Sequence, residues 1–158
     1  MFFYILGIIL IILDQVTKLL ITDKLDPGQT IPIIDGILHF TYVHNPGIAF
    51  GLFPKMNVII IVLSIVTIFL LFLIYRKTNS GDIWTKTALI FIASGAVGNL
   101  LDRIQYNVVI DFIDFRFWPV FNLADSFIVI GVFILFIIIF LTKEGNKDAS
   151  DPFSIRTD

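Results

Sequence analysis

Four aspartates in the second half of this chain could carry hydrolytic chemistry. Two carboxylates held close together can share one proton, because the charge of one raises the pKa of the other. The ionised member can then activate a water molecule while the protonated member supplies a proton to a carbonyl oxygen, without a metal or a covalent intermediate. The candidates are Asp102, Asp111, Asp114 and Asp125. Spacing alone does not decide which two of them pair.

Other catalytic groups are scarce. The chain contains no cysteine, which excludes thiol nucleophiles, disulfides and thiolate metal sites. Its two histidines, His39 and His44, are five residues apart, which is a weak signal for a metal site. The net charge of −2 gives no basis for nucleic-acid binding. We therefore expect neither a metal nor a cofactor.

The apolar residues predict a membrane protein. They make up 57% of the 158 residues, and the mean hydropathy is +0.93, above what a soluble domain shows. The segment 56–75 has no charge and is long enough to cross a hydrocarbon core about 30 Å thick. We predict four transmembrane helices, the first retained rather than cleaved as a signal peptide because it lacks a basic start and a small-residue cleavage site. They span residues 3–21, 56–75, 83–101 and 123–142.

These helices define one domain, residues 1–142, followed by a polar tail, 143–158, with the composition of a disordered end. Two longer connections separate the helices. The first, 22–55, is β-prone, and the second, 105–121, is rich in aromatic residues that favour the headgroup interface. The fold class is thus an α-helical integral membrane protein with a small β-hairpin or sheet and a second loop over the site.

Two β-prone runs in the first connection, 30–34 and 37–43, flank Asp35 and Gly36, a favoured two-residue hairpin turn. The basic residues set the orientation, since cytoplasmic loops carry an excess of Lys and Arg. The short link after the second helix carries Arg76 and Lys77, with Lys86 just beyond it. We therefore expect both termini in the cytoplasm and both longer connections outside.

This topology brings most polar residues of the helices to the outer membrane boundary. A charge near the centre of a span costs roughly 2.5–3.5 kcal/mol and usually marks function. Several such residues at one depth, on different helices, indicate one shared site. They are Asp14, Lys18, Asn45, Asn99, Asp102, Arg103, Asp111, Asn122 and Asp125.

Each of these residues also has a simpler explanation. Asp14 and Lys18 are four residues apart and could form only an intrahelical ion pair. Asn122 and Asp125 have the spacing of a helix N-cap and an acid in the first turn. Arg103 could anchor a helix end at the interface. The remaining alternatives are helix packing for Gly95 and Gly98 and solvated surface charges for Asp102 and Asp114.

Three other classes of protein fit less well. A proton-coupled transporter would carry acids deep within a span and polar residues along both membrane halves, whereas the inner half here is almost purely aliphatic. A lipid-phosphate enzyme would need arginine and histidine together, and neither Arg103 nor Arg116 has a nearby histidine. A purely structural subunit would not account for ordered polar motifs.

Those motifs resemble the ordered motifs of bacterial lipoprotein signal peptidase. Each is weak alone, but together they occur in the family's order at compatible spacing, from Asp14 to about Gly131. They are DQVTK (14–18), NPGIAFG (45–51), GAVGNLLDR (95–103), VIDF (109–112) and FNLADS (121–126).

The resemblance implies an aspartic endopeptidase of the bacterial inner or plasma membrane that needs no cofactor. Its substrates would be prolipoproteins with diacylglycerol on a cysteine, cut just before that residue, and it would contact membrane lipid. Nothing in the sequence demands more than a monomer. Asp111 and Asp125 match the catalytic dyad. Residues matching site-lining or supporting positions are Asn45, Asn99, Arg103, Asn122, Asp14, Lys18 and Gly95.

Overall fold

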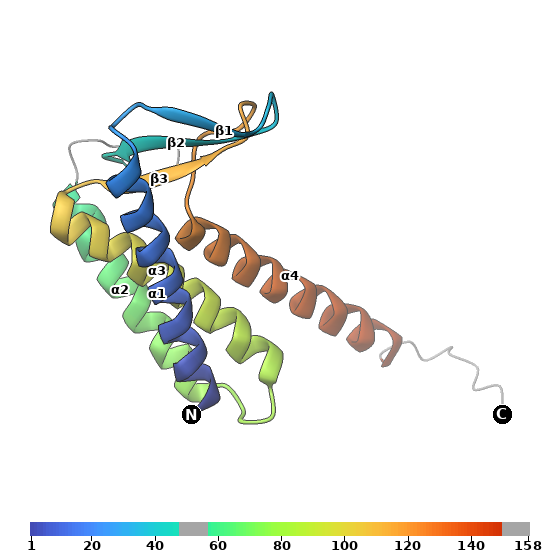
Figure 1. Cartoon of the computed structure of the whole chain (residues 1–158). Coiled ribbons are helices and arrows are strands. Elements are labelled where there is room, and N and C mark those ends of the chain that lie inside the picture. Colours follow the sequence, from blue (N-terminus) through green and yellow to red (C-terminus); the bar gives the residue numbers. More distant parts are fainter. Residues whose placement is uncertain (48–56, 150–158) are drawn as a thin grey trace.

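The fold consists of four long helices and a small antiparallel sheet, in a computed structural model that describes residues 1–47 and 57–149. Figure 1 shows the sheet at one end of the helices and the N-terminus at the other. The elements are α1 (Phe2–Lys24), β1 (Thr30–Ile34), β2 (Leu38–Asn45), α2 (Asn57–Lys77), α3 (Ile83–Tyr106), β3 (Val109–Asp114) and α4 (Leu123–Ala149).

Each helix contains an apolar stretch long enough to cross a membrane, so the predicted fold class is confirmed. Helix α2 is the most apolar, and only 6% of its span is buried. A helix that is apolar on every side and yet unburied by protein must contact lipid. The chain is therefore a multi-pass membrane protein.

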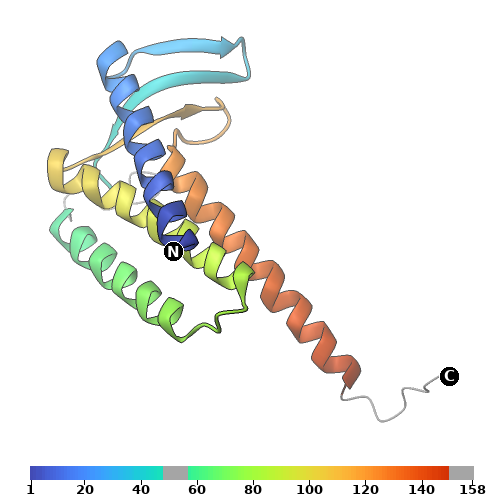
Figure 2. The same cartoon turned by 60° about the horizontal axis from the view of Figure 1, so that its bottom comes forward.

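Helix α3 is the centre of the bundle and packs against α1, α2 and α4. Figure 2 shows α3 between α2 and α4, with α1 crossing in front. The α3–α4 interface is the most extensive and depends on Gly95, where an added Cβ would collide with the carbonyl oxygen of Ala124. Small residues of this kind let membrane helices approach closely, and here they bring the start of α4 against α3.

The sheet has the order β1-β2-β3 and is antiparallel throughout. The predicted two-residue hairpin turn is wrong by one residue, because Ile34 pairs with Leu38 and three residues connect the strands. The Ile37 N–H closes the turn on the Ile34 carbonyl at 3.0 Å. Gly36 has φ 72°, a value that glycine adopts without strain.

Strand β3 lies in the aromatic connection, where the sequence predicted only a loop. It pairs with β2, and its apolar side chains cover the end of α1, where Ile21 and Leu25 pack against Ile110 and Phe112. The alternation of apolar residues did not predict this strand, because two of its six residues are aspartates. The sheet is thereby fastened to the helices.

The last helix is longer than predicted. It continues through Ala149, into the segment for which composition predicted disorder, and that segment is rich in good helix formers such as Lys143 and Glu144. Three predictions lie outside the described residues: the end of the 45–51 motif, the start of the second span at residue 56, and the tail from residue 150 onward.

Candidate active site

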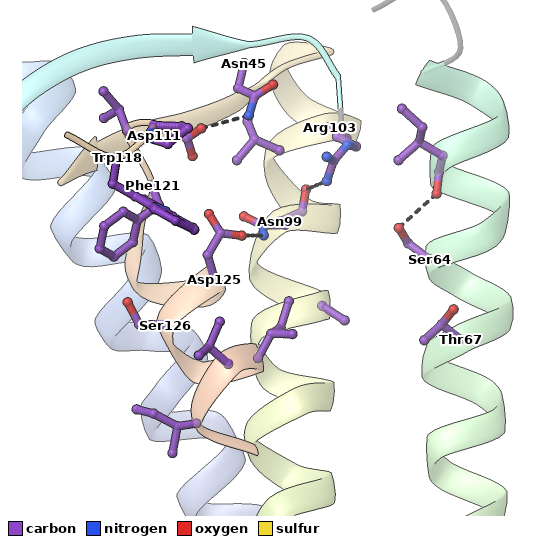
Figure 3. A pocket seen from close by; sticks show the side chains of 18 of the residues that line it. Asn45, Ser64, Thr67, Asn99, Arg103, Asp111, Trp118, Phe121, Asp125 and Ser126 are labelled. Atoms are coloured by element: carbon purple, nitrogen blue, oxygen red, sulfur yellow. Dashed lines mark hydrogen bonds between the residues drawn. The ribbon is translucent and has the colours of Figure 1, made fainter. Parts of the chain in front are cut away.

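Asp111 and Asp125 face the same space at the sheet end of the helices (Figure 3). Asp111 is on β3 and only 2% exposed, and Asp125 is in the first turn of α4. Phe121 brings them together, because it pairs with Ile113 through a bond of 2.7 Å from the Ile113 N–H. This pairing folds the chain back after β3, so α4 begins beside the strand that carries Asp111.

Asn122 and Asp125 form a reciprocal capping box at the start of α4. The Asp125 N–H donates to Asn122 Oδ1 at 2.9 Å, and the Asn122 N–H donates to Asp125 Oδ2 at 3.3 Å. The capping explanation therefore describes this pair correctly. It does not exclude a second role, since Asp125 also lines a cavity.

Asn122 and Asn45 both donate to Asp111. Asn122 is fully buried, and its Nδ2 lies 2.8 Å from Asp111 Oδ1. Asn45, at the end of β2, donates from Nδ2 to Asp111 Oδ2 at 2.9 Å. One amide therefore holds each carboxylate oxygen of Asp111.

Asn99 on α3 holds Asp125. Its Nδ2 donates to Asp125 Oδ1 at 2.7 Å, while its Oδ1 accepts from Lys18 Nζ at 3.2 Å and from Asn122 Nδ2 at 3.0 Å. Because two donors contact the oxygen, the amide has a single satisfactory orientation. In that orientation its NH₂ group points at Asp125.

Asp14, Lys18 and Asp102 form a buried ionic cluster behind this pair, which we call the Lys18 cluster. Their exposed fractions are 0%, 2% and 1%, and Lys18 Nζ lies 2.8 Å from Asp14 Oδ2 and 2.7 Å from Asp102 Oδ2. Gln15 adds donors from its Nε2 to both acids, at 3.2 and 3.0 Å. The intrahelical pair exists, but it is part of a network between helices.

Two aspartates that could have been solvated surface charges are buried, so that explanation is wrong for both. Asp102 belongs to the Lys18 cluster, and Asp114 is 5% exposed. Asp114 accepts from Thr41 Oγ1 at 2.7 Å and from the Arg116 N–H at 2.8 Å. Burial raises the pKa of Asp114, but these hydrogen bonds, together with the charges of Arg116 and His39, outweigh burial and keep the pKa below its usual value. Asp114 therefore stabilises the sheet.

Arg103 reaches the site from the last turn of α3 and is 8% exposed. Its Nη2 donates to the Gly47 carbonyl at 2.8 Å and its Nη1 to the Asn99 carbonyl at 3.3 Å. It also lines the cavity that contains Asp111 and Asp125. An arginine with these contacts orders the chain after β2 and places a positive charge beside the two acids.

Other candidate positions lie elsewhere. Gly95 packs α3 against α4 and does not line the cavity. His39 pairs with Asp114 across β2 and β3, and His44 bonds with the Tyr42 hydroxyl at 2.7 Å. Within the described residues, no group of three His, Asp or Glu side chains could hold a metal ion.

The cavity beside the two acids has a volume of about 940 Å³ and is mostly apolar. Figure 3 shows its acidic end at Asp111 and Asp125, with Ser64 and Thr67 of α2 across from them. Its aromatic wall comes from the connection after β3, in which the rings of Phe115 and Phe121 stack at 6.0 Å. Lining residues from that connection are Phe115, Phe117, Trp118, Pro119, Val120 and Phe121.

The charge state of Asp111 suits proton transfer near neutral pH. The pKa of Asp111 is raised from 3.8 to about 7, first by burial and second by the charge of Asp125. The hydrogen bonds from Asn45 and Asn122 and the charge of Lys18 act in the opposite direction. Asp111 can therefore both give up and take up a proton near neutral pH.

The site residues that the sequence singled out fall into two groups. Asn45, Asn99, Arg103, Asp111 and Asp125 line the cavity. Lys18 and Asn122 lie behind it and contact the lining residues Asn99 and Asp111, whereas Asp14 contacts Lys18 and the backbone of Ala124. Sequence reasoning left Asp102 undecided between the shared site and a solvated surface charge. Its position one helical turn beyond Gly98 and Asn99, on the same face of α3, was the available signal.

Comparisons with known proteins agree with the fold. Two solved structures described as bacterial membrane enzymes match the fold. One has a TM-score of 0.85 at 27% identity and covers 99% of this chain and 94% of the other, and the second has a TM-score of 0.80 at 29% identity over 87% and 91%. The fold and site thus define a multi-pass membrane enzyme.

The family follows from the sequence comparisons. A family model described as signal peptidase (SPase) II matches residues 6–141. The lipoprotein signal peptidase of Halothermothrix orenii is 48% identical over 133 residues, 84% of this chain and 90% of the relative. That of Clostridioides difficile is 44% identical over 148 residues, 90% and 99% of the two chains. The chain belongs to the signal peptidase II family, which confirms the resemblance and makes it an aspartic endopeptidase.

Proposed function

We propose that this chain removes the signal peptide from prolipoproteins, with Asp111 and Asp125 as the catalytic dyad. The observation that carries the proposal is the environment of the two acids. They share one cavity, amide donors hold each of them, and the charge of Asp125 helps to raise the pKa of Asp111 to about 7. Acids with a perturbed pKa that share a cavity are typical of catalytic pairs.

In the proposed reaction the dyad holds one proton and positions a water molecule. The ionised carboxylate takes a proton from the water as its oxygen bonds to the scissile carbonyl carbon, and the protonated carboxyl gives its proton to the carbonyl oxygen. The tetrahedral intermediate then returns a proton to the dyad as its C–N bond breaks and the leaving nitrogen is protonated. The products are a free carboxylate on the signal peptide and a free amine on the lipoprotein.

The substrate is proposed to carry diacylglycerol on the cysteine that follows the cut. The shape of the cavity supports a lipidated substrate. Away from the two acids, the cavity is lined by apolar side chains of α2 and α4, two helices with lipid-facing surfaces. They would let acyl chains stay in the membrane while the peptide bond lies at the dyad. These cavity residues include Ile60, Leu63, Ile128, Val129 and Ile130.

The test is incubation of the purified protein with a diacylated prolipoprotein and with its unlipidated counterpart. We expect cleavage of the lipidated substrate just before the modified cysteine, and much slower cleavage of the other. Asp111→Asn and Asp125→Asn should each abolish cleavage while the protein keeps its thermal unfolding transition. A fully active variant would exclude that residue as a catalyst, and an inactive parent protein would exclude the function.

We also propose that the sheet end faces outside and that both termini are cytoplasmic, with residues 1–142 as a single peptidase domain active as a monomer and 143–158 as a polar cytoplasmic tail. Arg76, Lys77 and Lys86 support this orientation, because they lie at the end of the helices opposite the sheet. The chain has no cysteine, so single cysteines can be introduced. A membrane-impermeant maleimide should label Asp35→Cys in intact cells and should not label Asn79→Cys. The reverse pattern would invert the topology.

A further inference from the structure

Two buried carboxylates bind the backbone immediately before each member of the proposed dyad. Asp14 Oδ1 accepts the N–H of Ala124 at 2.9 Å, and Ala124 precedes Asp125. Asp102 Oδ2 accepts the N–H of Ile110 at 3.1 Å, and Ile110 precedes Asp111. The two contacts are equivalent, although one joins α1 to α4 and the other joins α3 to β3.

Lys18 connects these two carboxylates. Its ammonium lies 2.8 Å from Asp14 Oδ2 and 2.7 Å from Asp102 Oδ2. Its third contact is Asn99 Oδ1 at 3.2 Å, and Asn99 in turn donates to Asp125 at 2.7 Å. An ammonium has three N–H donors, and each therefore has a partner.

We propose that Lys18, acting through Asp14 and Asp102, positions the two catalytic aspartates relative to one another. The inference rests on the proposed function for the identity of the dyad. Lys18 has no contact with the cavity, so its role is positioning rather than catalytic. A continuous chain of contacts joins the two aspartates. It starts at the Ile110 N–H next to Asp111, passes through the side chains of Asp102, Lys18 and Asp14, and ends at the Ala124 N–H next to Asp125.

The physical character of the cluster favours positioning over simple stabilisation. Buried ion clusters often add little stability, because desolvation offsets the attraction between the charges. Charge-assisted hydrogen bonds are nevertheless short and directional, and these are shielded from water. They can fix a distance even where they add little to the free energy of unfolding. A dyad that shares a proton needs such a fixed distance.

The test uses a variant that removes the link and keeps both backbone contacts. In Lys18→Met with Asp102→Asn, the new amide oxygen can still accept the Ile110 N–H, and Asp14 still caps Ala124. The change removes one positive and one negative charge, so the net charge of the cluster stays the same. We expect kcat on the lipidated substrate to fall on the order of 100-fold, as for a displacement of about 1 Å, with KM within about threefold of the parent value.

A second readout needs no substrate. Infrared titration of the carboxyl groups, with Asp111→Asn to identify the band, should give a pKa of Asp111 near 7 in the parent protein. In the double variant, loss of the Lys18 charge alone would raise that pKa, whereas a more distant Asp125 would lower it, so a fall in the pKa is the result expected from displacement of the dyad. A stability role alone would not lower this value.

Lys24→Met is the matched control, since it removes an exposed lysine from the last turn of the same helix. It should leave kcat, KM and the titration unchanged. If the double variant does not fold, Asp14→Asn with Lys18→Met and Asp102→Asn leaves no charge in the Lys18 cluster and is measured in the same way. Unchanged kcat and titration in the folded variant would overturn the proposal, as would failure of both variants to fold. Absence of cleavage by the parent would refute the function, while the titration would still decide the positioning.

Discussion

Asn122 donates from Nδ2 to Asp111 Oδ1 at 2.8 Å, and this bond joins the N-cap of α4 to the aspartate on β3. The same amide accepts the Asp125 N–H through its oxygen at 2.9 Å. One fully buried side chain therefore contacts both members of the proposed dyad. Its capping role and its site role can be separated by substitution. Capping needs only an oxygen that accepts the Asp125 N–H, whereas the contact with Asp111 needs the NH₂ group as donor.

Asn122→Ser should retain the cap and lose the donor to Asp111. Serine is a good N-cap, so the thermal unfolding midpoint should stay within a few degrees of the parent value. Its shorter hydroxyl cannot reach Asp111 while it caps the helix, so kcat should fall on the order of 100-fold, as when a single positioned donor is lost. Asn122→Ala should lose the same activity and also about 1 kcal/mol of stability. Full activity of Asn122→Ser would show that the bond to Asp111 is dispensable.

The pH dependence of cleavage should show an alkaline limb near pH 7. The pKa of Asp111 is raised to about 7, so its proton is present below that pH and is lost as the pH rises through it. Above this value both carboxylates are ionised and none can protonate the substrate carbonyl. We therefore expect kcat/KM for the lipidated substrate to fall about tenfold per pH unit above the limb. A rate that stays constant from pH 6 to pH 9 would contradict a shared proton.

Asn45→Ala should move that limb to higher pH. Asn45 donates to Asp111 at 2.9 Å and so stabilises its ionised form, which lowers its pKa. Loss of the donor should raise the pKa of Asp111 and extend the active range upward, even if the maximal rate falls. Asn79→Ala, an exposed asparagine at the other end of the helices, is the control and should leave the limb in place. A limb displaced to lower pH in Asn45→Ala would reverse the assigned role of the bond.

The sequence could predict the four helices and the hairpin because those features are local. Apolar length identifies a span, and a glycine turn between β-prone runs identifies a hairpin. Strand β3 depends instead on pairing with β2 and on packing against Ile21 and Leu25, neither of which its own residues reveal. Its aspartates argue against a strand until the partners are known.

In the site, too, local features could be predicted from the sequence, and features that depend on distant segments could not. Asp125 and Asn122 could be recognised together because a capping box has a fixed local spacing. Asp102 could not be distinguished from a surface charge, because its burial depends on Lys18 of another helix and on the peptide of Ile110. Motif resemblance selected Asp111 among the aspartates, but the amides that hold it come from β2 and α4. Contacts between distant segments leave no periodic signal in the chain.

Gly95→Ala should impair both stability and activity. The new Cβ would collide with the carbonyl oxygen of Ala124 and lie 2.7 Å from Ile128 Cγ1, so α3 and α4 must separate. Overpacking of this kind costs about 1–3 kcal/mol, which detergent-phase thermal unfolding can measure. Because Ala124 precedes Asp125, the shift also displaces the dyad, and kcat should fall with it. Gly81→Ala is the control, since the nearest atom to its added Cβ is 3.9 Å away. If Gly95→Ala matched that control in unfolding midpoint and rate, close contact between these helices would not be what holds Asp125 in place.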